Sequence, residues 1–336
     1  MKNRHFILVL LILHLFLGCS EEKSIRIAAI QMNCKLGELD TNLAKAEKFI
    51  REAFEQNAEM VILPEFFTTP VFGFPYNDKI LEAVCPLEGK PLLLLKKLSQ
   101  EYNGIIGGSF LAFHGTEAYN SFVLIFPDGS TYVHNKDYPT VHENCYYAGG
   151  DDDGIFVTPI GNIGVALCWE YIRSGTARRL LDQVDIIIGG SCWPGENKTE
   201  YEGRSLSLLK STLTKFPRLL GVPVVHANHV GEVRYFCKED TTKNEKFLFL
   251  GETQIVNGYG DIIERLSYKD GEGIIISDVI LGKIDSPTDS IPDNFWIPDL
   301  DESTINWWKE SLTGDYRKYY EMTALPYYLK KWTNGK

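Results

Sequence analysis

Short apolar runs rich in Val, Ile and Leu recur along this chain, and three segments of this kind end at a residue with a reactive or charged side chain. Residues 61–63 lead to Glu65, a strand-like segment leads to Lys136, and residues 163–167 lead to Cys168. Apolar runs of this length are typical of strands buried within a sheet. Because α/β enzymes gather functional side chains where strands end, we expect these three residues at the rim of a sheet.

Helical segments and strands alternate at first and are then interrupted by hairpins. Helices are predicted from an N-cap at Asp40 or Thr41, from Pro91, and over residues 201–216. Two hairpins are predicted. The first spans residues 121–135 with its turn at 127–130, and the second lies near 160–163. The predicted strands are residues 24–32, 60–63, 105–113, 121–126, 186–188, 222–228, 253–256 and 274–278. This order indicates a mixed α/β sheet with helices on one face, and not a doubly wound parallel sheet.

Glu65, Lys136 and Cys168 supply a base, a cation and a nucleophile. A cysteine attacks as thiolate and needs a proton acceptor, and a cation stabilises the oxyanion that such an attack creates. Apolar neighbours predict a partly buried Glu65 with raised basicity, and a turn after the strand is expected to expose Cys168 at its apex. Taken singly, a solvated loop glutamate, a surface lysine and a buried structural thiol are the simpler interpretations.

The three segments, in this order, resemble the nitrilase or carbon-nitrogen hydrolase superfamily over residues 24–284. Segments 119–121, 127–129 and 251–260 fit the same resemblance. It implies that Glu65, Lys136 and Cys168 form a catalytic triad, within a four-layer α-β-β-α sandwich whose members usually pair as homodimers or larger homo-oligomers. The triad would act on a small amide or nitrile through a thioester.

The resemblance also implies a second glutamate that holds the lysine and the substrate, and here it falls on Glu143. The backbone N–H of Trp169 is a further candidate for stabilising the oxyanion. A pocket of apolar and aromatic character is expected around this site, with walls supplied by Phe72, Phe74, His142, Tyr147, Trp169 and Trp193.

The branch of the family stays open. Amidase is the first choice, because most branches cleave amides or carbamoyl groups. The spacing from Lys136 to Glu143 and the presence of Glu170 resemble nitrilases, whereas residues 65–70 and 191–194 depart from their pattern. Acyl transfer to an amine is a further alternative, and a noncatalytic surface lipoprotein that uses the sandwich only for binding is a rival from a different class.

The N-terminus resembles a bacterial lipoprotein signal. Lys2 and Arg4 precede an apolar run over residues 6–17, which Gly18 and Cys19 follow. This pattern predicts a signal peptide over residues 1–18, with Cys19 as a lipidated mature N-terminus. The expected location is therefore the cell envelope, at its periplasmic or outer face. Phe16 stands where such a signal usually has Leu, and Leu17 stands where it usually has a small residue. An uncleaved membrane anchor is the alternative.

Other classes of function find little support. A net charge of -11 with dispersed acidic residues argues against a nucleic-acid partner. The Gly-x-Ser-x-Gly motif of serine hydrolases is absent from the sequence, and no Cys or His pair has the spacing of a structural zinc site. We expect neither a metal nor an organic cofactor. Residues 285–336, rich in Trp, Tyr and Pro, are expected to pack along the body or a partner subunit as an extension.

Overall fold

The structure is a computed structural model that describes residues 23–71, 75–195, 203–236, 244–285, 291–297, 300 and 302–333. Side chains at 233–236 and 244–247 are outside that description. The predicted signal with Cys19, and the predicted pocket residues Phe72 and Phe74, also lie outside the described residues.

The described chain forms strands and helices that alternate through most of its length. The strands are β1 (Ser24–Met32), β2 (Met60–Ile62), β3 (Cys85–Pro86), β4 (Ile105–His114), β5 (Glu117–Ile125), β6 (Thr131–Asn135), β7 (Ile155–Thr158), β8 (Gly161–Leu167), β9 (Ile186–Ser191), β10 (Val224–Phe236), β11 (Asn244–Val256), β12 (Ile262–Ser267) and β13 (Gly273–Ile280). The α-helices are α1 (Leu39–Glu55), α2 (Asp78–Ala83), α3 (Lys90–Tyr102), α4 (Ser174–Leu180), α5 (Arg204–Leu220), α6 (Glu302–Ser311), α7 (Asp315–Tyr319) and α8 (Leu325–Thr333). Short turns of helix are η1 (Val141–Cys145), η2 (Cys168–Tyr171), η3 (Tyr268–Asp270) and η4 (Tyr320–Ala324).

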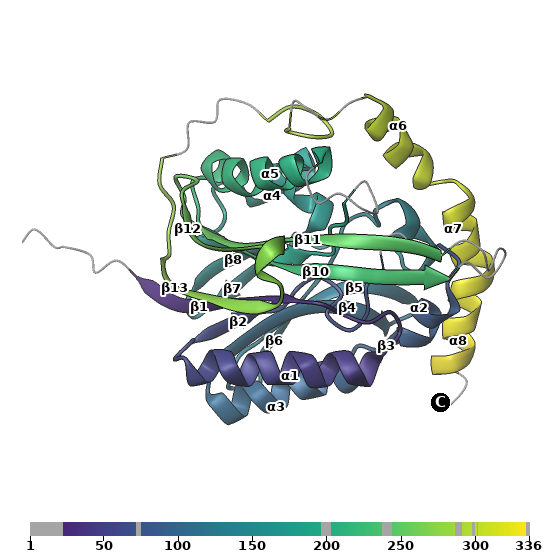
Figure 1. Ribbon diagram of the computed structural model, residues 1–336, viewed down its shortest axis with the longest axis horizontal. Coiled ribbons are helices and arrows are strands. Elements are labelled where there is room, and N and C mark those ends of the chain that lie inside the picture. The colour runs from purple at the N-terminus through teal and green to yellow at the C-terminus, as the bar shows by residue number, and fades with distance from the viewer. Residues whose placement is uncertain are drawn as a thin grey trace, which may run out of the picture.

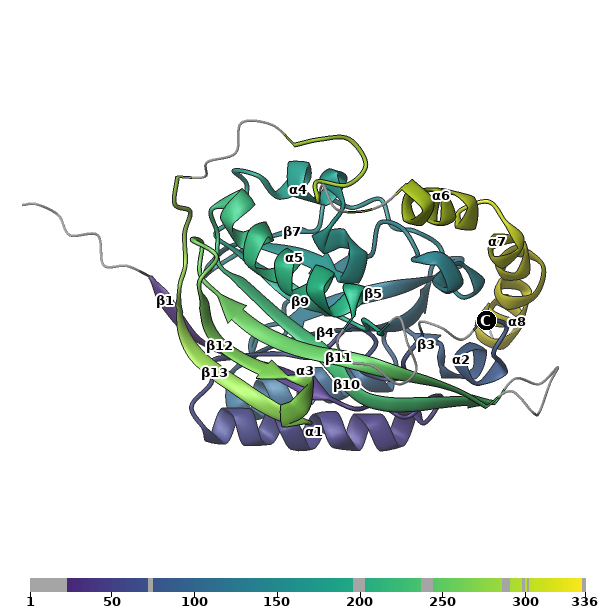
Figure 2. The same cartoon turned by 45° about the horizontal axis from the view of Figure 1, so that its top comes forward.

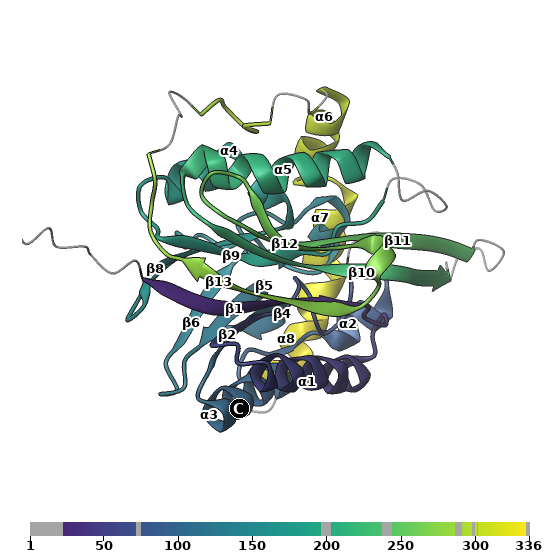
Figure 3. The ribbon, with the colours of Figure 1, turned by 60° about the vertical axis from the view of Figure 1, so that its left-hand side comes forward.

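Two halves of one continuous set of strands pack face to face. The strand order is β6-β5-β4-β2-β1-β10-β9-β8-β7, and β1 joins β10 through only two residue pairs, Gln31 with Asn228 and Met32 with His229. This short junction lets the sheet fold over on itself. Helices α1 and α3 cover the outer face of one half, and α4 and α5 cover the outer face of the other (Figure 1; Figure 3).

Three apolar layers fill the spaces between these four layers. In β1, Ala28 and Ile30 pack against the α1 and α3 side, whereas Ile27 and Ala29 belong to the cluster between the two half-sheets. In β9, Ile187 packs toward α4 and α5 while its neighbours face inward. Alternation of side chains along each strand therefore builds the sandwich, because successive residues point to opposite faces. The predicted four-layer α-β-β-α fold is confirmed.

The sequence predictions differ from the structure mainly at element ends. Strand β1 has the predicted bounds, and the two hairpins form as β5–β6 and β7–β8. The predicted N-cap of the first helix was wrong, because α1 begins at Leu39 after Glu38, so that Asp40 lies inside the first turn. Strand β12 and helix α4 were not predicted, since their apolar patterns are short.

The parallel strands bring their carboxyl ends to one edge of the sandwich. Strands β1, β2 and β4 run parallel, as do β1, β10, β9 and β8. The C-terminal segment α6–α8 runs along this edge from one half-sheet to the other, as its yellow ribbon shows in Figure 1 and Figure 2. None of the helices in the described part of the chain is long and apolar enough to cross a membrane.

Candidate active site

Glu65 is held in a tight turn just beyond β2. Its carboxylate is buried, and the turn is fixed by Phe66 N–H donating to Ser109 Oγ at 3.0 Å and by His229 Nε2 donating to the Glu65 carbonyl at 2.6 Å. Phe66 has a positive φ of 56°. A non-glycine residue in this region is strained by about 1–3 kcal/mol. The surrounding bonds therefore hold the chain in a conformation that turns the Glu65 side chain inward.

Cys168 occupies a second strained turn, at the end of β8. It has a positive φ of 50° and opens the short helix η2. Glu170 Oε2 accepts a hydrogen bond from Leu167 N at 2.8 Å, which closes this turn on the strand. Because the first N–H groups of a helical turn have no intrahelical acceptor, the N–H of Trp169 is a suitable donor to a reacting group beside the thiol.

Lys136 lies between two buried carboxylates. Its Nζ is 2.8 Å from Glu65 Oε1 and 2.8 Å from Glu143 Oε2, and all three side chains are inaccessible to solvent. This is not the surface lysine of an ordinary hairpin, which was the simpler interpretation of the sequence. The structure thus brings Glu65, Lys136 and Glu143 into direct contact.

The hydrogen bonds around Glu65 leave one of its oxygens less occupied. Oε1 accepts from Lys136 and from Asn120 Nδ2 at 2.9 Å, whereas Oε2 accepts from Cys192 N at 2.8 Å. Each carboxylate oxygen has two lone pairs. Oε2 can therefore take a further proton or hydrogen bond, as a general base must.

Burial and charge set the protonation of this cluster. Burial raises the pKa of Glu65, and despite the opposing charge of Lys136 that pKa reaches about 7. Burial opposes the charge on Lys136, but Glu143 and Glu65 outweigh it and raise its pKa above the usual range. Lys136 is therefore a permanent cation, and Glu65 is the group of this pair that can exchange a proton near neutral pH.

Cys168 is more enclosed than the sequence suggested. Only 2% of its surface is exposed, so the expectation of an exposed thiol at the apex of the turn was wrong. Burial and the charge of Glu65 raise the pKa of Cys168 well above its usual value, although Lys136 opposes this. The resting residue is thus a thiol, which would have to give up its proton in order to act as a nucleophile.

Glu143 has one oxygen that is saturated and one that is not. Oε2 accepts from Lys136, from Thr140 N at 2.7 Å and from the hydroxyl of Tyr147. Oε1 is buried and has no hydrogen-bond partner within the described residues. A buried acceptor without a partner is costly, so this oxygen is suited to receive an N–H from a bound molecule.

A second network, which the sequence did not reveal, fixes the Lys136 segment to the Cys168 turn. Glu170 Oε1 accepts from Asp137 N at 3.0 Å, while Oε2 holds Leu167. Buried Arg173 contacts the Asp137 carboxylate and donates to the Tyr138 carbonyl at 3.0 Å. Glu170, which the sequence offered only as a marker of the family branch, therefore helps to set the spacing between Lys136 and Cys168, together with Asp137 and Arg173.

The predicted pocket residues are placed unequally around this cluster. The ring of Tyr147 packs on Phe66, 6.1 Å between centroids, and its hydroxyl reaches Glu143. His142 and Trp169 lie at the rim, beside Trp307 of the extension. Trp193 is 3% exposed, and its Nε1 donates to Ser205 Oγ at 3.0 Å, so it packs in the layer that contains α5.

The other cysteines and candidate ligands are arranged differently. Cys34, Cys85, Cys145 and Cys192 are buried free thiols, as is Cys168. Within the described ranges, no three His, Cys, Asp or Glu side chains converge as metal ligands would.

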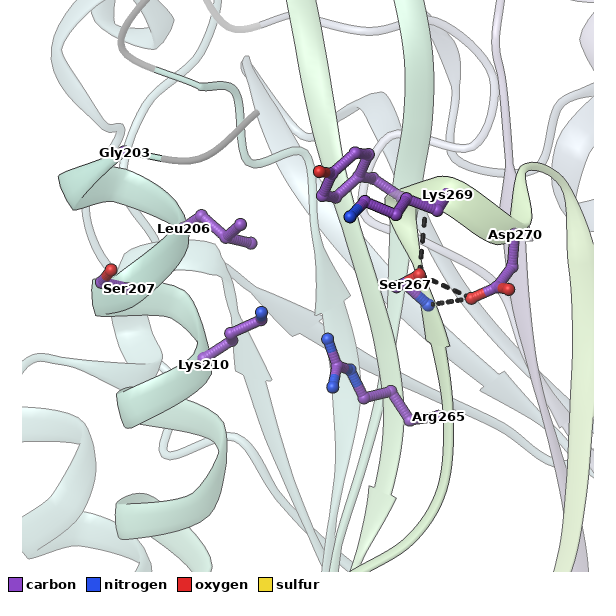
Figure 4. Close-up of a pocket in the computed structure, with 9 residues that line it drawn as sticks. Gly203, Leu206, Ser207, Lys210, Arg265, Ser267, Lys269 and Asp270 are labelled. Atoms are coloured by element: carbon purple, nitrogen blue, oxygen red, sulfur yellow. Dashed lines mark hydrogen bonds between the residues drawn. The ribbon is translucent and has the colours of Figure 1, made fainter. Parts of the chain in front are cut away.

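A cavity of about 750 Å³ lies elsewhere, between α5 and the segment from β12 to η3 (Figure 4). Lys210, Arg265 and Lys269 give it a basic lining, but Arg265 is bound by both oxygens of buried Glu252, at 2.6 and 2.8 Å. Glu65, Lys136 and Cys168 are not among its lining residues. The group formed by Glu65, Lys136, Glu143 and Cys168, which we call the reactive cluster, is therefore distinct from this open surface cavity.

Comparison with known proteins identifies the family. The model of the family described as carbon-nitrogen hydrolase matches residues 26–287. The chain belongs to this family. Among curated relatives of this carbon-nitrogen hydrolase, the N-carbamoylputrescine amidase of Arabidopsis thaliana is 24% identical over 275 residues, covering 80% of this chain and 90% of the relative. A nitrilase of Pyrococcus abyssi is 30% identical over 167 residues, covering 48% of this chain and 63% of the relative.

Solved structures share the fold. A carbon-nitrogen hydrolase from Helicobacter pylori G27 superposes with a TM-score of 0.65 at 19% identity, covering 77% of this chain and 90% of the other. An amidase from Nesterenkonia sp. AN1, in which acrylamide has added to the active-site cysteine, gives 0.59 at 16% identity, covering 76% and 93%. Together with the family match, these relatives agree with the prediction of a hydrolase acting on carbon-nitrogen bonds other than peptide bonds.

Proposed function

We propose that this carbon-nitrogen hydrolase is an amidase that works through a thioester on Cys168, with Glu65 as general base and Lys136 as the cation that faces the oxyanion. The observation that carries the proposal is the buried contact of Lys136 with both Glu65 and Glu143, at 2.8 Å each, in a cluster whose charges act on the thiol of Cys168, itself held in a strained turn. An ion cluster buried with a thiol would be an expensive way to stabilise a fold, which favours a role in catalysis.

The first half of the reaction forms the thioester. Glu65 takes the proton of Cys168 while Sγ attacks the carbonyl carbon of the amide. The carbonyl oxygen becomes an oxyanion facing Lys136 Nζ and the N–H of Trp169. The carbon-nitrogen bond then breaks, Glu65 returns the proton to the departing nitrogen, and ammonia or an amine leaves the acyl group on Cys168.

The second half regenerates the enzyme. Water attacks the thioester carbon and gives a proton to Glu65, and the second oxyanion uses the same two donors. The carbon-sulfur bond breaks, a carboxylic acid is released, and the proton on Glu65 returns to the sulfur of Cys168. One base with a pKa of about 7 can serve both halves, because it is readily charged and discharged near neutral pH.

A primary amide fits the polar groups better than a nitrile. An amide nitrogen has hydrogens to donate to Glu143 Oε1, the buried acceptor that lacks a partner among the described residues. A nitrile nitrogen has none to donate. Curated relatives include both amidases and nitrilases, so nitrile hydrolysis is the second candidate, supported by the short matched segment of the nitrilase relative.

The proposal is tested by incubating the purified protein with a panel of primary amides, N-carbamoyl amines and nitriles, and measuring ammonia, amine and acid. Intact-mass spectrometry after acid quenching should show an acyl group on the peptide that contains Cys168. Ammonia release from amides, without turnover of the matched nitriles, is expected. Acid formed from the nitriles and none from the amides would favour the nitrilase alternative.

Replacement of Glu143 by Gln is expected to weaken amide binding and the placement of Lys136 together. Gln lacks the negative charge that pairs with Lys136, and with its amide oxygen in the place of Oε2 its NH2 group stands where Oε1 would accept from the substrate, so we expect kcat/KM to fall about 100-fold. Steady-state kinetics on the best amide measures this. Glu264→Gln, at an exposed position of β12, is the control, and an equal loss in both variants would contradict a specific role for Glu143.

We also propose that the chain is exported and held at the cell envelope by lipid on Cys19. The support is the sequence alone: basic residues, an apolar run over 6–17, and Gly18 before the cysteine. Mass spectrometry of the membrane-associated protein should find an acylated Cys19 as the first residue. A mature N-terminus elsewhere, or an unmodified Cys19, would contradict it, and Cys19→Ser should release the protein from the membrane.

We further propose, from the family resemblance, that the body forms a homodimer or a larger homo-oligomer. Sedimentation equilibrium of the protein from residue 20 onward should give at least twice the mass of one chain. A single species at monomer mass across the micromolar range would contradict this.

A further inference from the structure

The C-terminal extension covers the edge at which the reactive cluster lies. Helices α6 and α7 pack on η1, the turn that contains Glu143. These helices lie beyond residue 287, where the family match ends. The extension is therefore an addition of this chain to the common body, placed where it can affect what enters the site.

Buried aromatic residues anchor the extension to the body. Trp308 packs on Phe295 at 5.1 Å and on Tyr138 at 6.0 Å, and the guanidinium of Arg173 lies 5.9 Å from its ring. At the other end, the Tyr320 hydroxyl accepts from Ala118 N at 3.2 Å. The extension thus has anchors other than Trp307, the residue next to Trp308 on α6.

Trp307 joins the two backbone segments that hold the reacting groups. Its ring lies 6.5 Å from that of Trp169, which follows the nucleophile, and 6.2 Å from that of His142, which precedes Glu143. Tyr316 continues this group, 5.0 Å from His142 and nearly perpendicular to it. We call Trp169, Trp307, His142 and Tyr316 the aromatic rim.

Exposure distinguishes Trp307 from the residues around it. The side chains of Glu65, Lys136 and Glu143 are inaccessible and Cys168 is 2% exposed, whereas Trp307 is 42% exposed. A large aromatic ring left half open next to a closed reactive centre has a free surface available for contact with a ligand.

We infer that Trp307 is a specificity-determining residue that binds a flat apolar group of the substrate, at the aromatic rim. The substrate class is then an amide that bears an aromatic or similarly flat group. The rings of the aromatic rim meet at steep angles, so a flat group can lie against the face of one ring and the edge of the next. This inference rests on the proposed cysteine chemistry.

The test compares two reagents that alkylate Cys168 by losing iodide: iodoacetamide and an N-naphthyl iodoacetamide. Mass spectrometry of the peptide that contains Cys168 gives the rate constant of its alkylation by each reagent. The rate constant with the naphthyl reagent is divided by that with iodoacetamide, so that changes in the reactivity of the thiol itself cancel. We expect Trp307→Ala to lower this ratio about three- to tenfold. Trp307→Phe should keep most of it, and Trp307→Leu, apolar but not flat, should lose it.

The controls separate recognition from folding. Met322→Ala removes an apolar side chain of the same extension that is 78% exposed, and should leave the ratio unchanged. Thermal unfolding should be alike for all variants, because Trp308 and Tyr320 remain as anchors. In Trp307→Ala, where the ratio falls, KM should rise for an aromatic amide and stay unchanged for butyramide.

Each outcome decides the matter. A ratio that is unchanged in Trp307→Ala overturns the inference and leaves the proposed function intact. A ratio that rises in this variant does the same, because it would mean that the ring only obstructs entry to the site. If neither reagent modifies Cys168 in any variant, the proposed function falls and this inference falls with it.

Discussion

Replacing Cys168 by alanine is expected to reduce kcat/KM for amide hydrolysis by about 10⁴-fold or more, to the background of the assay. Glu65, Lys136 and Glu143 are poor substitutes for the thiol, because Lys136 is held as a cation between the two carboxylates. The same variant should lose the acyl adduct in the mass spectrum. Initial rates of ammonia release, with the adduct measured in parallel, check both effects.

A structural role for the thiol makes a different prediction. Cys168 is buried, so removing its sulfur leaves a small cavity and is expected to lower stability by about 1 kcal/mol. Cys34→Ala, another buried thiol that lies near the α1 layer, should show a similar loss of stability with normal turnover. Retention of activity in Cys168→Ala, or loss of activity in Cys34→Ala, would contradict the assignment of the nucleophile.

The positions of several strand ends could be predicted from the sequence, and with them the region of the fold in which Glu65 and Cys168 lie. Glu65 and Cys168 each follow an apolar run, and such runs become parallel strands whose carboxyl ends share an edge. Strand order therefore brings Glu65 and Cys168 to the same edge of the sheet. The 2.8 Å contacts of Lys136 with Glu65 and Glu143 depend instead on the register of β5 with β6 and on the turn into η1, which have no signal in the local sequence.

Other features of the site depend on tertiary packing and have no local signal. The positive φ at Phe66 and Cys168 is unfavourable for these residue types, so their identity gives no hint of it. The bond from Cys192 N to Glu65 joins residues 127 positions apart. The enclosure of Cys168 likewise comes from segments far away in the chain, which is why the sequence suggested an exposed thiol.

In the C-terminal extension, too, the contacts with the site could not be predicted from the local sequence. Its many aromatic residues predicted that it packs along the body or a partner subunit, since so much apolar surface is costly to expose. The contacts of Trp307 with Trp169 and His142 join segments that are more than 130 residues apart in the sequence. Only the folded chain reveals that this surface meets the reactive edge.

Replacing Glu65 by Gln is expected to reduce kcat/KM about 10³-fold, because the proton of Cys168 then has no acceptor. In the native protein, kcat/KM should rise about tenfold per pH unit below pH 7 and level off above it, because burial raises the pKa of Glu65 to about 7 and only its charged form is a base. No further change is expected up to about pH 9, since the pKa values of Cys168 and Lys136 are both raised above their usual values. The pH profile of the Gln variant should be flat where the native profile rises.

The comparison of pH profiles tests more than a loss of rate does. In Glu65→Gln, the new amide oxygen would still accept from Lys136, but the amide N–H would be set against Cys192 N–H, so some loss of stability is expected from the substitution itself. Structural damage alone would lower the rate at every pH but would leave the rise of kcat/KM below pH 7, the acid limb of the profile, in place. Glu59→Gln, just before β2 at its opposite end, should keep both the rate and the acid limb. A native profile that is flat from pH 5 to 9, or an acid limb retained in Glu65→Gln, would show that the proton passes to another group.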